Sequence, residues 1–160
     1  MKRKDFYQLI QPLTDKLYRV AFALIPDDLQ AEQLVIDGMN AFLLKERNSI
    51  MFRDVNLENK KETLILRRHY YKGILRFLVD IGTRRAIQLN EQMRITRPPE
   101  YNSFYSLDPK VRVVMSLRYD SQFTVEEIED ILFIPRFEII EKIHNGRFLL
   151  LNDLNKGANL

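Results

Sequence analysis

Apolar residues recur every three or four positions through most of the chain, a period that predicts helices rather than strands. The first helical segment runs from Lys4 to Ile25 and is predicted to bend or restart at Pro12. A second spans about Leu29 to Leu44, and a third, much longer one spans about Glu62 to Gln92. With two further helical segments near the C-terminus, the pattern predicts an all-α fold.

The stretch from Thr124 to Arg147 has the pattern of two helices joined by a tight turn. Thr124 and Glu127 have the spacing of a capping box, so we expect a helix to begin there. Pro135 disfavours helical geometry at the residue before it, which ends the first helix near Leu132. This pattern is typical of a helix-turn-helix that reads DNA, but it is equally that of a structural helical hairpin. The spacing alone leaves both interpretations open.

The segment 94–106, RITRPPEYNSFYS, contains a diproline and few periodic apolar positions, which is typical of a linker. We therefore predict two small helical domains, residues 1–93 and 107–160, joined by this linker. Asp108 followed by Pro109 predicts a capped helix start for the second domain, and this helix should extend to about Tyr119. The polar segment 45–61 of the first domain is predicted to be a loop.

Composition argues against several classes of function. The 160 residues include no cysteine, two histidines and five glycines, without a phosphate-binding glycine motif. These counts disfavour thiol chemistry, a histidine or thiolate metal site and a nucleotide-binding enzyme. We expect a non-enzymatic protein without cofactors. The sequence also has no apolar run long enough to cross a membrane and no secretory signal, so we expect a cytoplasmic protein.

Charge is unevenly distributed along the chain. Residues 67–97 hold eight basic and two acidic side chains, whereas residues 98–160 hold seven basic and ten acidic ones. A polyanion should therefore bind the middle of the chain. Aromatic side chains alternate with the cations there and could stack on unpaired bases, although the same mixture could be a core with an ordinary solvated face. The cations are Arg67, Arg68, Lys72, Arg76, Arg84 and Arg85, and the flat side chains are His69, Tyr70, Tyr71 and Phe77.

Three motifs occur in a familiar order. They are LYRVAFALIPDDLQAEQLVIDGMNAF at 17–42, ILRFLVDIGTRRAIQL at 74–89, and SLDPKVRVVMSLRY followed by the helix-turn-helix pattern. In this order and spacing the chain resembles the extracytoplasmic-function (ECF) group of bacterial RNA polymerase sigma factors over nearly its whole length. The first two motifs are similar to region 2 of that family, and the third is similar to region 4. The matching region 4 positions are Leu107, Pro109, Arg112, Glu127-Ile128 and Ile134-Pro135.

The resemblance implies a transcription initiation factor that binds core RNA polymerase and promoter DNA, under the control of an anti-sigma factor or another regulatory protein. It implies a region 2-like helical bundle and a region 4-like helix-turn-helix domain. The residues implied to face the polymerase clamp are Glu32, Gln33, Asp37 and Asn40. Those implied to contact DNA in region 2 are Arg67, Arg68, Lys72, Arg76, Arg84 and Arg85, with Tyr70 and Tyr71 near the melted strand. Those in region 4 are Arg136, Lys142, His144, Asn145 and Arg147.

The chain differs from the family pattern in the region 4-like part. Phe133 occupies the turn position where glycine is usual, which predicts strain if the residue is left-handed. Glu138, Ile140 and Glu141 replace the usual basic or small polar residues of the recognition helix, and carboxylates there are repelled by phosphates. The alternative is therefore a diverged sigma-like adaptor that binds protein partners without selecting promoters. A helical scaffold without nucleic acid is a third interpretation.

Overall fold

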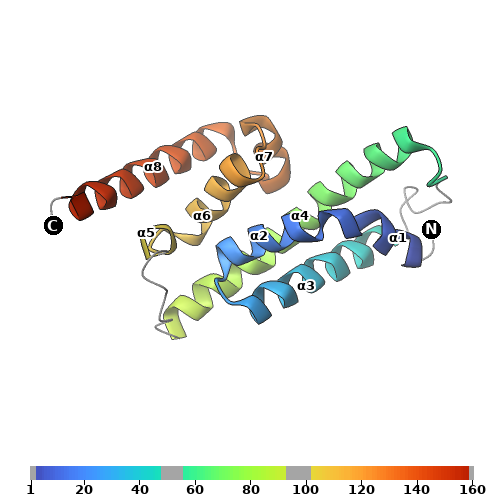
Figure 1. Ribbon diagram of the computed structural model, residues 1–160, viewed down its shortest axis with the longest axis horizontal. Helices are drawn as coiled ribbons and strands as arrows, with labels where there is room; N and C mark the ends of the chain where they lie inside the picture. The colour runs from blue at the N-terminus through green and yellow to red at the C-terminus, as the bar shows by residue number, and fades with distance from the viewer. Residues whose placement is uncertain (1–2, 48–55, 93–101, 159–160) are drawn as a thin grey trace.

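The computed structural model describes residues 3–47, 56–92 and 102–158, and every regular element within these ranges is a helix (Figure 1). The all-α prediction is confirmed for this part of the chain. The helices are α1 (Arg3–Ile10), α2 (Thr14–Leu24), α3 (Asp28–Glu46), α4 (Lys60–Gln92), α5 (Asn102–Tyr105), α6 (Pro109–Met115), α7 (Val125–Leu132) and α8 (Arg136–Ala158). A 3-10 turn, Gln11–Leu13, joins α1 to α2 at the predicted proline bend.

Side-chain caps fix the predicted helix starts. The carboxylate of Asp27 accepts a hydrogen bond from the amide of Gln30 at 2.9 Å, and α3 begins there. Asp108 accepts from the amide of Lys110 at 2.8 Å and starts α6. Because the first amides of a helix have no partner within it, each cap satisfies a donor that would otherwise be left unpaired. Local sequence therefore determines where these helices begin.

Helices α3 and α4 pack against each other along the α1–α4 bundle. Gly73 and Gly82, which lower the intrinsic helix propensity of α4, do not interrupt it. A Cβ on Gly73 would lie 2.3 Å from the ring carbon Cε2 of Phe42, and one on Gly82 would lie 2.6 Å from a methyl carbon of Leu34. These glycines are therefore explained by the close approach of side chains from α3.

Gly73→Ala should lower the free energy of unfolding by about 1–3 kcal/mol, because the added methyl group must displace the Phe42 ring. Gly157→Ala is the matched control, since a Cβ at that position of α8 meets no atom within 4 Å. The control should be neutral or stabilising by up to about 1 kcal/mol, the ordinary helix preference for alanine. Denaturant unfolding followed by circular dichroism measures both. Equal effects of the two substitutions would contradict the close approach.

Helices α6 and α7 pack against α2 and α4 of the α1–α4 bundle, and α8 packs against α6 and α7 on the side away from that bundle (Figure 1). Buried residues from both groups form one continuous hydrophobic cluster, and the rings of Tyr71 on α4 and Phe123 lie 5.7 Å apart within it. A π-helical turn, Ser116–Asp120, replaces the predicted last turn of the helix that begins at Pro109. The two groups of helices therefore share a core in this conformation.

Part of the predicted linker is structured. Residues 102–105 form α5, and the hydroxyl of Tyr105 donates a hydrogen bond to the backbone oxygen of Phe22 in α2 at 3.2 Å. Tyr105 and Leu107 are buried. The rest of the predicted linker, residues 94–101, lies outside the described ranges, as do residues 48–55 of the predicted loop.

Candidate nucleic-acid interface

Three cations predicted to bind DNA lie one helical turn apart on α4 and contact the acidic helix α7. Arg68 forms an ion pair with Glu127. The Lys72 ammonium lies 3.9 Å from Oε1 of Glu127 and 4.0 Å from Oδ2 of Asp130. Arg76 follows one turn later and donates to the backbone oxygen of Asp130 at 2.6 Å. This face of α4 therefore already holds an anionic surface, which the protein itself supplies.

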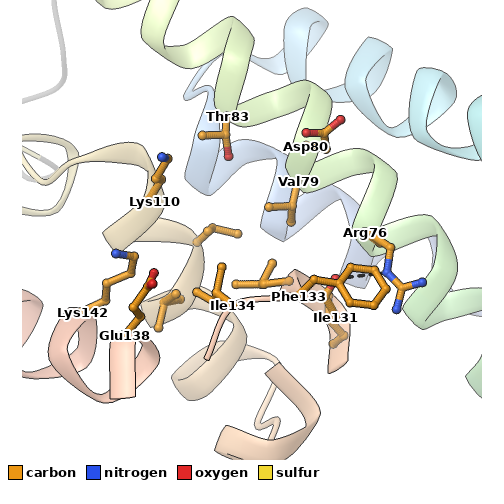
Figure 2. Close-up of a pocket in the computed structure, with 13 residues that line it drawn as sticks. Arg76, Val79, Asp80, Thr83, Lys110, Ile131, Phe133, Ile134, Glu138 and Lys142 are labelled. Carbon is orange, nitrogen blue, oxygen red and sulfur yellow. Dashed lines mark hydrogen bonds between the residues drawn. The ribbon is translucent and has the colours of Figure 1, made fainter. Parts of the chain in front are cut away.

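Arg76 also closes the turn between α7 and α8. Its Nε donates to the backbone oxygen of Ile131 at 3.3 Å, at the end of α7 where the helix dipole favours a cation. Its guanidinium carbon lies 3.7 Å from the centroid of the Phe133 ring, and Figure 2 shows the two groups stacked. Phe133 has φ 54° and ψ 37°, so this residue is left-handed, the condition under which the sequence predicts strain at the turn.

The glutamate of the α7 capping box, Glu127, also binds the cations of α4. The side chain of Glu127 accepts from the amide of Thr124 at 3.1 Å, and the threonine hydroxyl accepts from the amide of Glu127 at 3.2 Å. The hydrogen bond with Thr124 lowers the pKa of Glu127, burial opposes this, and the ion pair with Arg68 lowers it further. The carboxylate is therefore charged at neutral pH and faces the cations of α4.

The other predicted cations of α4 also have partners inside the protein. Arg67 donates to the backbone oxygen of Leu9 at 3.0 Å, near the end of α1. Arg84 pairs with Asp80 one turn earlier on the same helix, and Arg85 pairs with a carboxylate of α3. All six predicted cations of α4 are thus engaged in this conformation, and Arg84 alone contacts only α4 itself.

The two tyrosines predicted to lie near a melted strand are buried. Tyr70 is 0% exposed and packs against the rings of Phe6 and Phe42, with centroids at 5.8 and 5.2 Å. Burial raises the pKa of Tyr70 to about 12. Tyr71 is 8% exposed and contacts Phe123 from the C-terminal group. Separation of the two groups of helices would uncover Tyr71, whereas Tyr70 would remain in the core of the α1–α4 bundle.

The predicted region 4-like residues are divided between two sides of α8. Arg136 pairs with Glu126 across the turn at 2.8 Å. Lys142 lines a pocket that α8 forms with α4, α6 and α7. His144, Asn145 and Arg147 are exposed. The structure therefore does not gather the five side chains on one face.

Sequence reasoning missed the apolar surface of α8. Phe137, Phe148, Leu151 and Leu154 are 68, 65, 56 and 70% exposed. The signal was present in the sequence as apolar residues on more than one side of this helix, too many for a single buried stripe.

The residues implied to face polymerase lie on α3. Glu32 is exposed, and the Gln33 amide donates to Asp37 at 2.9 Å. Burial would raise the pKa of Asp37, but its hydrogen bonds with Arg85 and Gln33 lower it overall. Asn40 is half-buried. The set of polymerase-facing residues implied by the resemblance did not include the apolar Leu29 and Ile36, which are 78 and 50% exposed beside these polar groups.

Arg112 was noted in the sequence only as a motif position, and the structure assigns it a structural role. It is 1% exposed and donates four hydrogen bonds to backbone oxygens. Two go to Ala23 and Leu24 at the end of α2, at 2.9 and 2.8 Å. Two go to Tyr105 and Leu107, at 3.1 and 2.8 Å. Arg112 therefore links α6 to the α1–α4 bundle. An arginine inside the apolar run of residues 111–115 was the available signal.

Comparison with known proteins finds no match, either among protein-family models or among curated proteins. Within the described ranges, no helix is both long enough and apolar enough to span a bilayer. The same ranges contain no cluster of three or more histidine, cysteine, aspartate or glutamate side chains arranged to hold a metal ion.

Proposed function

We propose that the protein is a sigma-like transcription initiation factor that binds core RNA polymerase and engages promoter DNA mainly through α4. In this proposal residues 1–93 act as a region 2-like domain and residues 107–160 as a diverged region 4-like domain. Polymerase would bind the α3 surface around Glu32 and Gln33. The protein would need no cofactor and catalyse no covalent step, and it would act in the cytoplasm.

The observation that carries the proposal is the row formed by Arg68, Lys72 and Arg76. The three side chains follow one another at one-turn spacing and bind carboxylates and carbonyl oxygens. Phosphate oxygens offer the same chemistry to arginine and lysine, and a DNA backbone presents them in a row. A surface that binds α7 in this way is suited to bind DNA when α7 is displaced.

The contact with α7 makes DNA binding conditional. DNA and α7 would compete for the same three cations, so binding requires the C-terminal helices to leave α4. Separation would also expose the Tyr71 ring, which could then stack on an unpaired base. We therefore propose that the conformation described above is closed, and that contact with polymerase shifts the population towards an open one.

Co-purification with core RNA polymerase, followed by titration with forked promoter-like DNA at low and moderate salt, tests the function. We expect a stable polymerase complex whose DNA affinity falls steeply with salt, because several phosphate contacts release counterions. Failure to bind polymerase would overturn the proposal.

Replacement of the two acidic partners on α7 tests the closed state directly. Glu127→Gln with Asp130→Asn should raise DNA affinity roughly three- to tenfold, since each of these partly exposed ion pairs contributes about 1 kcal/mol or less to the competing contact. Fluorescence anisotropy with labelled forked DNA measures the change in the free protein.

The control variant is Glu129→Gln with Glu141→Gln. It removes the same charge from the C-terminal helices, but neither carboxylate forms an ion pair with α4 in the described part of the chain. Equal gains in DNA affinity for the two double variants would mean that general repulsion, and not competition by α7, limits binding.

A second candidate function is supported by the surface of α8. Exposed Phe137 and Phe148 lie on the same helix as Glu138 and Glu141, where a DNA reader would need cations. This combination favours a protein partner. The adaptor interpretation predicts polymerase binding without salt-sensitive capture of DNA, so the same titration separates the two functions.

A further inference from the structure

A pocket of about 360 Å³ lies between the two groups of helices (Figure 2). Val79 projects into it from α4, and Val113 and Val114 contribute from α6. Ile131 and Ile134, on either side of the α7–α8 turn, complete an apolar floor. The volume lies at the lower end of the range for small-molecule sites, which are mainly apolar with a few convergent polar groups.

Three of the six polar side chains that line this pocket are cationic. Lys110 and Lys142 extend from α6 and α8 at one end, and Arg76 lies at the other end against Phe133 (Figure 2). Within the described ranges neither lysine has a carboxylate within 4.0 Å, and Arg76 donates hydrogen bonds to the neutral backbone oxygens of Asp130 and Ile131. The positive charge is therefore not neutralised by ion pairs.

Two carboxylates also line the pocket, and they differ in their effect. Asp80 is paired with Arg84 and turns away along α4 (Figure 2). Glu138 lies near the two lysines and partly offsets their charge (Figure 2). The lysine end therefore carries two positive charges against one negative charge, with an apolar floor next to it.

We propose that this pocket binds a small amphipathic carboxylate, with its carboxylate between Lys110 and Lys142 and its apolar chain over Val79 and Ile134. The chain would replace water on the apolar floor, and the two ammonium groups would supply charge-assisted hydrogen bonds. A ligand of this class matches both the apolar lining and the charged groups of the pocket. A neutral ligand would use only the floor.

Ligand binding would favour the closed conformation. The walls of the pocket come from α4 on one side and from α6, α7 and α8 on the other, so the site is complete only when the two groups of helices are in contact. If the proposed function holds, the ligand should therefore weaken DNA binding by α4. Binding of the ligand itself does not depend on that function.

Isothermal titration calorimetry of the full chain with sodium octanoate, and separately with 1-octanol, tests the site. We expect one octanoate to bind with a submillimolar dissociation constant, and octanol to bind at least tenfold more weakly. Lys110→Gln with Lys142→Gln should weaken octanoate at least tenfold and leave octanol unchanged. Glu138→Gln should strengthen octanoate binding several-fold, because it removes the opposing charge.

Circular dichroism and unfolding midpoints establish that each variant is folded. Equal affinities for octanoate and octanol would overturn the assignment of an anion site, as would retention of octanoate affinity in the double lysine variant. Absence of saturable binding by either probe would overturn the pocket as a small-molecule site. None of these outcomes depends on DNA or polymerase, so they are distinguishable from failure of the proposed function.

Discussion

Arg112→Met is expected to lower the free energy of unfolding by about 3–5 kcal/mol, the cost of leaving several buried polar groups without partners. Methionine can fill much of the space of the arginine stem but donates no hydrogen bond. The backbone oxygens of Ala23, Leu24, Tyr105 and Leu107 would each lose the donor that Arg112 provides. Urea unfolding of the variant measures the loss.

Arg19→Met is the matched control because Arg19 also connects the two groups of helices. Its guanidinium lies 3.5 Å from the carboxylate of Asp120, and both side chains are largely exposed, at 63 and 45%. An exposed pair of this kind contributes less than about 1 kcal/mol. If Arg112→Met were no more destabilising than the control, the buried arginine would not be the principal polar link between α2 and α6.

Tyr70→Ala is expected to destabilise the protein by about 3–5 kcal/mol, the usual range for removal of a large buried aromatic side chain. Tyr70 packs against both Phe6 and Phe42 and so links α1, α3 and α4. The resulting cavity cannot close without movement of these helices. Thermal unfolding and DNA affinity should be measured together on this variant.

Tyr119→Ala serves as the control, since this tyrosine is 53% exposed and should change stability by no more than about 0.5 kcal/mol. A Tyr70→Ala protein that kept its stability but lost DNA binding would restore the role implied by the sequence resemblance. A large loss of stability would establish Tyr70 as a core residue, and Tyr71 would then be the remaining tyrosine of the pair that could stack on a base.

Local features of the fold were predictable from the sequence because neighbouring residues determine them. The capping box at Thr124 and Glu127 and the caps at Asp27 and Asp108 are formed as expected. The continuity of α4 through Gly73 was also predicted, but its reason was not, because the close contact with Phe42 involves a residue 31 positions earlier.

The partners of the candidate site were less predictable. The row of cations on α4 is visible in the sequence, but the periodicity of α4 does not reveal that α7 covers it. The sequence also does not separate Tyr70 from Arg84, which belong to the same basic and aromatic segment. Tyr70 is buried, whereas Arg84 is exposed. A helix with different neighbours along its length has no single apolar face, so its pattern does not separate core from surface. The polymerase and DNA contacts stay predictions.

The left-handed conformation of Phe133 links the shape of one turn to the position of a whole group of helices. A residue with a side chain in this conformation carries a conformational cost of order 1–3 kcal/mol. The cation–π contact of Arg76 with the ring contributes a stabilisation of similar order, about 0.5–2 kcal/mol. In the proposed open conformation, the conformational cost at Phe133 would remain and the stacking with Arg76 would be lost. The α7–α8 turn would therefore favour the closed conformation.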